Sequence, residues 1–198
     1  SQPTKPETIA AVGPEQSLTY WLTIQKMLNK KPLGDPFESA GDIAFGNGWR
    51  FRLNLRPTQS GALYLINIGP GKNGAEEYDI LFPLPQENRL DPKLAANQTM
   101  QLPPTEWYRF VEQTGVEKLW LIWSAQPIPE LDAIFSDAAR NKKDPGVIVN
   151  PDQVAQIQFY LKNSARPEPI SDKAKKLTSV KARGDILVSL LELSHEAY

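Results

Sequence analysis

The chain has 198 residues, of which 40% are hydrophobic and 23% charged, a composition typical of a globular protein that buries its own core. Its 22 basic and 23 acidic side chains give a formal net charge of −1, which is no signal for nucleic acid or an anionic membrane. The absence of cysteine excludes disulfides and thiol catalysis, and a lone histidine, His195, argues against a multi-histidine metal site. We therefore predict no metal and no cofactor.

The N-terminal residues 1–16 are rich in proline, threonine and glutamate and contain few apolar side chains. This composition is typical of an extended linker or of a disordered terminus, so we predict a tether or a disordered N-terminus over 1–16 and a single domain over 17–198. No window holds 18 consecutive apolar residues, and we therefore expect no membrane span in this chain. The tether leaves room for an upstream membrane or kinase segment.

Strand patterns dominate the first two thirds of the chain. Apolar and polar residues alternate over 18–25 and again over 49–56, as in a strand with one solvated face. We predict that 62–68 pairs with 49–56 in a hairpin and that 78–84 forms a third strand. The almost wholly apolar run 117–124 predicts a central strand.

Helical spacing appears only late, over 129–143 and 151–163, where Asn150 is a candidate N-cap. Residues 164–184 are polar and basic without a usable period, and we expect a solvated loop there before 185–194 returns to a strand pattern. These elements predict a mostly β fold: an antiparallel immunoglobulin-like β-sandwich with two helices inserted at about 128–163.

Two features suggest catalysis or nucleotide binding, and each has a simpler interpretation. Residues 69–74 match G-x-G-x-x-G, but a dinucleotide site needs a helix after this motif, and a strand pattern follows instead. We therefore expect a glycine-rich hairpin loop. His195 lies near the C-terminal end, where nothing would orient a general base, and we expect a structural or exposed histidine.

The carboxylates form two clusters, Glu76, Glu77 and Asp79 in one and Asp35, Glu38 and Asp42 in the other. Glycoside hydrolysis needs two carboxyl groups held across a cleft by rigid elements. Both clusters are expected in loops, where solvated charge is the usual interpretation. No set of residues is therefore assigned a catalytic role.

Four residues are the candidate ligand-binding set: Arg50, Arg52, Arg56 and Trp21. The three arginines fall on the polar side of the strand 49–56, and guanidinium groups bind carboxylates and phosphates in a bidentate way. Trp21 falls on the polar side of the strand 18–25, where an aromatic ring serves contact surfaces. Ion pairing with neighbouring strands remains the alternative for the arginines.

A longer pattern resembles a bacterial domain of unknown function. It consists of the run WRFRLNLRPTQSGALYLINIGPG followed by YDILFPLP, TMQLP and EKLWLIWSAQP. The family's alternating strand, Gly-aromatic-Leu-Tyr hairpin, Leu-Phe-Pro strand end, hydrophobic-Pro segment and late strand ending in serine correspond to 51–55, 61–65, 81–83, 102–103 and 119–124. The resemblance covers about 18–127. This sequence departs from the pattern at Asn47 and Gly48, where a Gly-Asp pair often stands, and in the helical extension 128–163.

Members of that family are β-sandwich modules often appended to serine/threonine kinases, caspase-like peptidases or envelope lipoproteins, and they carry no known catalytic residues. The resemblance therefore implies a non-catalytic accessory domain, extracytoplasmic and bacterial, that binds a protein or cell-envelope ligand and no nucleic acid. Two alternatives remain open: a carboxylate-based glycan hydrolase and a structural spacer in an envelope assembly.

Overall fold

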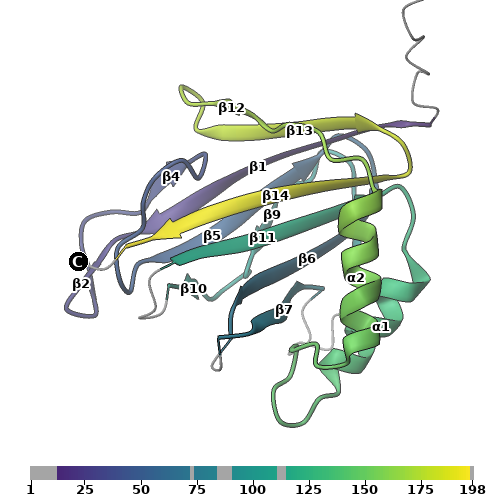
Figure 1. Ribbon diagram of the computed structural model, residues 1–198. Helices are drawn as coiled ribbons and strands as arrows, with labels where there is room; N and C mark the ends of the chain where they lie inside the picture. Colours follow the sequence, from purple (N-terminus) through teal and green to yellow (C-terminus); the bar gives the residue numbers. More distant parts are fainter. Residues whose placement is uncertain (1–12, 72–73, 84–90, 111–114, 197–198) are drawn as a thin grey trace, which may run out of the picture.

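The computed structural model describes residues 13–71, 74–83, 91–110 and 115–196. Three layers lie on one another: a sheet built around β1 and β5, a second sheet built around β6 and β11, and two helices (Figure 1). The prediction of a mostly β, antiparallel fold with two late helices is confirmed.

The first sheet, here sheet A, has the strand order β10-β5-β1-β13-β12, with β4 also paired to β1 and β9 to β5. All its pairs are antiparallel. Its strands are β1 (Glu15–Gln25), β4 (Phe37–Ser39), β5 (Arg50–Pro57), β9 (Met100–Leu102), β10 (Tyr108–Arg109), β12 (Ile170–Asp172) and β13 (Leu177–Arg183).

The second sheet, here sheet C, has the order β14-β11-β6-β7, with β8 paired to β6. The prediction that the apolar run 117–124 lies in the sheet centre is confirmed, because β11 pairs with β14 on one side and β6 on the other. Its strands are β6 (Gly61–Pro70), β7 (Glu76–Phe82), β8 (Lys93–Leu94), β11 (Gly115–Ser124) and β14 (Ile186–His195). The short strands β2 (Met27–Leu28) and β3 (Lys31–Pro32) form a separate ribbon.

The main core lies between the two sheets. Alternate residues of each long strand point into it, as the period of two requires, and they include Leu18, Leu22, Leu53, Leu65, Leu121, Trp123 and Leu187. Trp123 is fully buried, and its indole N–H donates to Oε1 of Gln16 at 3.0 Å. This bond satisfies the one polar group that the largest core side chain brings into the interior.

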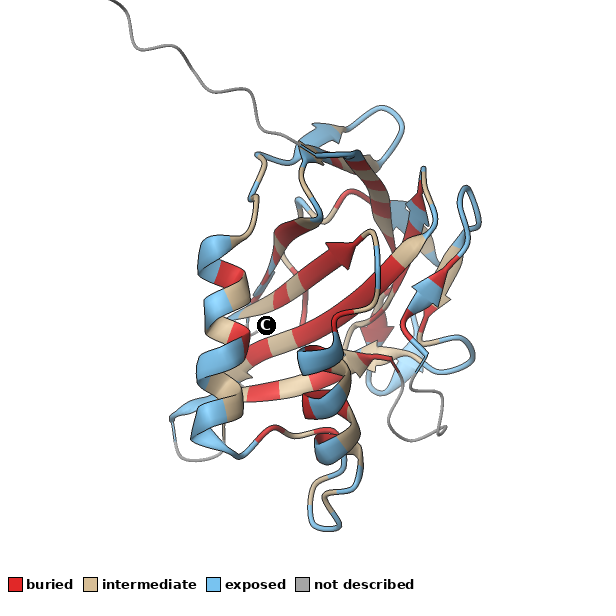
Figure 2. Ribbon diagram, turned by 90° about the vertical axis from the view of Figure 1, so that its right-hand side faces the viewer, coloured by how far each residue is buried: buried red, intermediate tan, exposed pale blue. Residues whose placement is uncertain are grey.

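The helices α1 (Pro129–Ala139) and α2 (Pro151–Asn163) cover the outer face of sheet C (Figures 1 and 2). The hydroxyl of Tyr64 joins the layers, since it donates to Oδ1 of Asp132 at 2.7 Å and accepts the N–H of Ile128 at 2.8 Å. The predicted N-cap is confirmed: Oδ1 of Asn150 accepts the N–H of Asp152. No helix in the described part of the chain has the length and apolar character needed to cross a membrane.

Three predictions about the elements are wrong. The strands β5 and β6 do not form a hairpin, because the turn at 58–60 carries the chain from sheet A to sheet C. Strand β1 begins at Glu15, so the last two residues of the range 1–16 are strand, while 1–12 lies outside the described residues. The first helix ends at Ala139, four residues before the end of the predicted range.

The segment 164–184 is also different from the expected loop. It contains β12 and β13, and β13 pairs with six residues of β1 inside sheet A. The apolar content of this segment is low because only two side chains of β13, those of Thr178 and Val180, are buried. The lysines 173, 175 and 176 lie in the turn between these strands, and the first two pair with Asp42 and Asp172.

Candidate functional site

Two neighbouring strands bring the predicted binding residues together on the outer face of sheet A. Trp21 is paired with Asn54 across β1 and β5, and the flanking pairs join Thr23 to Arg52 and Thr19 to Arg56. We call the outer face formed by Trp21, Arg50, Arg52 and Arg56 the arginine face. It lies on the opposite side of the sandwich from the helices, which cover sheet C.

The three arginines of this face have different surroundings. Arg52 donates from Nε to the carbonyl of Glu106 at 2.8 Å and from Nη2 to that of Thr105 at 2.7 Å, and its guanidinium lies 4.2 Å from the ring centroid of Trp107. This arginine therefore holds the segment after β9. Arg56 is exposed, and Arg50 is half-buried.

The polar side chains beside Trp21 are hydrogen-bonded to one another. Asn54 donates to Oγ1 of Thr23 at 2.9 Å, and the hydroxyls of Thr19 and Ser179 lie 3.1 Å apart. Trp21 is half-buried among them. The arrangement presents an aromatic ring and the exposed guanidinium of Arg56 on a polar sheet face, which suits contact with a polar partner surface.

A second candidate site is an acidic pocket of about 440 Å³ at one end of the sandwich, whose lining includes Asn67, Glu77, Asp79 and Glu117. The prediction that the first acidic cluster lies in a loop is wrong, because Glu77 and Asp79 belong to β7. In the other cluster, Glu38 belongs to β4. Gly69 leaves room between two carboxylates: it is paired with Glu77, and a Cβ there would lie 2.6 Å from Oε2 of Glu117.

The surroundings of Asp79 in the acidic pocket disfavour the charged form of its carboxyl group. Burial, with smaller contributions from the nearby carboxylates of Glu77, Glu117 and Asp144, raises the pKa of Asp79 to about 6. Glu117 accepts a hydrogen bond from Nδ2 of Asn67 at 2.9 Å. Within the described residues, no group of acidic or histidine side chains has the arrangement to hold a metal ion.

A third candidate site lies where the C-terminal end of α2 meets β11, a groove of about 450 Å³ that we call the α2 groove. Its lining includes Trp120 and Arg166, and the guanidinium of Arg166 lies 4.7 Å from the ring centroid of Trp120. Our sequence reasoning missed this site. The alternation in β11 was a usable signal, since it sends Trp123 into the core and Trp120 to the opposite face.

The two remaining candidates, the glycine-rich motif over 69–74 and His195, occupy positions that suit a structural role. Gly69 lies near the end of β6, Gly71 and Gly74 lie between β6 and β7, and the next described element is the strand β7, which pairs with β6, where a dinucleotide site requires a helix. His195 ends β14 and is buried, with its ring centroid 5.4 Å from that of Phe110. A structural role for His195 agrees with this position.

Comparisons of the chain with family models, with curated proteins and with solved structures found no match.

Proposed function

We propose that this chain is a non-catalytic accessory domain that binds a protein or cell-envelope ligand through the arginine face. The observation that carries the proposal is the position of Trp21 and Arg56, which share one sheet face that the helices leave uncovered. A sandwich whose other outer face is packed by helices has this face available for a partner. The resemblance to bacterial accessory domains supports the same function.

The finer features of the proposal follow from that resemblance. We propose an immunoglobulin-like relationship for the sandwich and an extracytoplasmic location in a bacterium, as an appended module of a larger protein. Two antiparallel sheets packed face to face support the first of these. The lack of cysteine is compatible with the second.

Site-specific photo-cross-linking in the cells that produce the protein tests the arginine face. A photoreactive amino acid is placed at position 21 or 56, and a matched control carries it at the exposed Lys142, beyond α1 on the helical side. We expect a discrete adduct from both face positions, none from position 142, and loss of the adduct at position 21 when Arg56→Glu is added. Absence of adducts at both face positions would favour a structural spacer and overturn the proposal.

A carboxylate-based glycan hydrolase is the second candidate, and the acidic pocket favours it. Glu77 and Glu117 lie on strands on either side of β6, so their Cα atoms are about 10 Å apart, and both line the same pocket. Asp79 beside them has the raised pKa of a general acid. Paired carboxyl groups across a cleft are the requirement for glycoside hydrolysis.

Release of reducing ends from peptidoglycan and from soluble polysaccharides measures hydrolysis directly. If the pocket is catalytic, Glu117→Gln and Asp79→Asn abolish release while Arg56→Glu leaves it unchanged. If the accessory-domain proposal holds, the wild-type chain releases no reducing ends at acidic or at neutral pH. The two candidates are therefore separated by one assay on one protein.

A further inference from the structure

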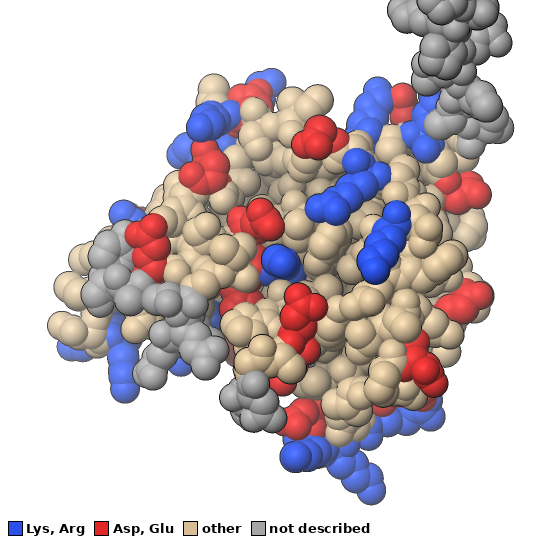
Figure 3. All heavy atoms as spheres, viewed as in Figure 1, with Lys and Arg blue, Asp and Glu red and all other residues tan. Residues whose placement is uncertain are grey.

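The α2 groove combines an apolar floor with a basic rim. Its floor includes Ile68, Leu161 and the half-buried ring of Trp120, all packed in the helix-side core. The rim carries the three cations Lys118, Lys162 and Arg166 and one lining acid, Glu76. Figure 3 shows Lys and Arg side chains gathered on this face, where β11 and β14 meet the C-terminal end of α2.

The cations of the rim make no ion pair with any residue that the structure describes. Among the described residues, the ion pairs are four, and none of them involves Lys118, Lys162 or Arg166. Three unpaired cations around one groove repel one another, and an anion placed between them relieves this repulsion. The groove is therefore complementary to negative charge.

Trp120 adds a polar group to this apolar floor. Its indole N–H is buried and donates to no acceptor in the described part of the chain. A buried donor without an acceptor costs free energy that a ligand oxygen recovers by accepting the bond. Arg166 lies over the face of the same ring and is exposed, so its guanidinium is accessible to a ligand.

We propose that the α2 groove binds an organic anion that carries a flat apolar group. The flat group packs on the floor with Trp120, and the anionic group lies between Lys118, Lys162 and Arg166. A volume of about 450 Å³ is within the range of small-molecule sites and fits a ligand of two fused or linked rings. This proposal concerns the face of sheet C and does not depend on the arginine face.

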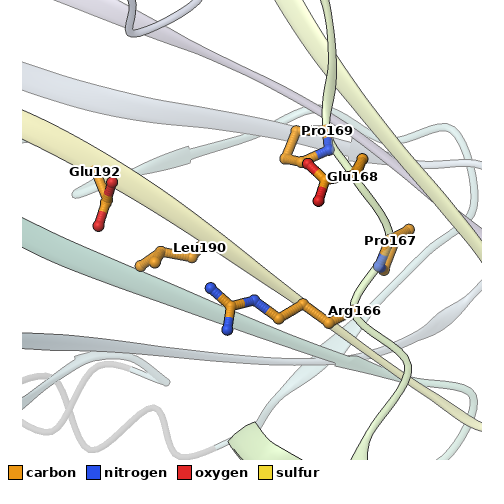
Figure 4. Close-up of a pocket in the computed structure, with 6 residues that line it drawn as sticks. All are labelled: Arg166, Pro167, Glu168, Pro169, Leu190 and Glu192. Atoms are coloured by element: carbon orange, nitrogen blue, oxygen red, sulfur yellow. The ribbon is translucent and has the colours of Figure 1, made fainter.

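An adjoining hollow restricts the charge of the ligand. Arg166 also lines this second cavity of about 440 Å³, which is bounded by Glu168 and Glu192. Figure 4 shows the Arg166 side chain reaching toward Leu190 and Glu192 of β14, with Glu168 on the segment after α2. These two carboxylates repel a second anionic group beyond Arg166, so the groove favours a ligand whose negative charge lies at one end.

Anilinonaphthalene sulfonate and its uncharged analogue phenylnaphthylamine test the proposal, because the two share a flat ring system and differ in the anionic group. Fluorescence titration of the full chain is expected to show saturable binding at one site for the sulfonate and at least about tenfold weaker binding for the neutral analogue. Arg166→Gln with Lys118→Gln is expected to weaken sulfonate binding about tenfold or more and to leave the neutral analogue unaffected.

Three controls place the site and guard against a folding defect. The Lys142→Gln variant removes an exposed lysine from the loop beyond α1, and Arg56→Glu alters the arginine face; both are expected to bind the sulfonate like the wild type. In NMR spectra, the indole N–H signal that Trp120→Phe removes is expected to shift on sulfonate binding, while the other tryptophan signals stay in place. Equal binding of the two probes, or an unmoved Trp120 signal, would overturn the proposal.

Discussion

Arg52 on sheet A and Arg166 beside sheet C form the same type of contact with different consequences. Each guanidinium lies over a tryptophan ring, at 4.2 Å from Trp107 for the first and 4.7 Å from Trp120 for the second. Arg52 also donates to two backbone carbonyls, and so it fixes a segment of its own chain. Arg166 makes no hydrogen bond or ion pair within the described residues.

This difference shows that a cation over an aromatic ring is not by itself a binding feature. What matters is whether the remaining donors of the guanidinium are already satisfied. On sheet A two donors of Arg52 are bonded to backbone carbonyls, which leaves Arg56 and Trp21 as the groups most available to a partner. On sheet C the arginine and the indole beneath it both retain hydrogen-bonding capacity, and this makes the α2 groove the better site for a small ligand.

The largest expected effect separates the two tryptophans of β11. Trp123→Ala removes a fully buried ring and its bond to Gln16, and we expect unfolding free energy to fall by about 3–5 kcal/mol. Trp120→Ala removes a half-buried ring whose N–H makes no bond in the described chain, and we expect a loss of about 1–2 kcal/mol. Urea denaturation of both variants measures the difference. Equal losses would contradict the contrast between the two faces of sheet C.

In the acidic pocket, by contrast, the buried carboxyl group of Asp79 opposes folding when it is charged. The pKa of Asp79 is about 6 in the folded chain against 3.8 unfolded, so folding favours its protonated form. Its contribution to stability is present below the unfolded value, falls as the pH rises from about 4 to 6, and is lost above that range. At pH 7 the charged form costs about 2 kcal/mol once solvent screening is allowed for.

Asp79→Asn removes this titration. We expect the variant to equal the wild type in stability at pH 4 and to exceed it by about 2 kcal/mol at pH 7, measured by urea denaturation across that range. Glu38→Gln is the matched control, because Glu38 is an exposed carboxylate on another strand. If the difference in stability between Asp79→Asn and the wild type stays constant with pH, the pKa of Asp79 is not raised by folding.

Much of the fold follows from local pattern. The alternation over 18–25 and 49–56 places Leu22 and Leu53 in the core and Trp21 and Arg52 outside it, and the structure has them so. The N-cap at Asn150 is equally local. Pairing between strands is not local: a short polar turn at 58–60 is compatible with a hairpin and with the observed crossing from sheet A to sheet C. Only the packing of both apolar faces decides between them.

The candidate sites are less predictable for the same reason. Trp120 belongs to β11, whereas Lys162 and Arg166 lie at or just beyond the C-terminal end of α2, and the three meet only because α2 packs on sheet C. The strand β13 escaped prediction because two buried residues, Thr178 and Val180, are too few to produce an apolar alternation. Its place is set by β1, which supplies the backbone partners and a long apolar face.

The smallest expected effect tests the opening contrast between the two arginines. Arg52→Ala removes two hydrogen bonds to backbone carbonyls and the contact with Trp107, and we expect unfolding free energy to fall by about 1 kcal/mol. Arg166→Ala removes only a contact with Trp120 at an exposed position, so we expect a change within about 0.5 kcal/mol. Urea denaturation measures both changes. If Arg166→Ala lowers the free energy of unfolding more than Arg52→Ala does, Arg166 supports the fold, and the contrast between the two arginines is wrong.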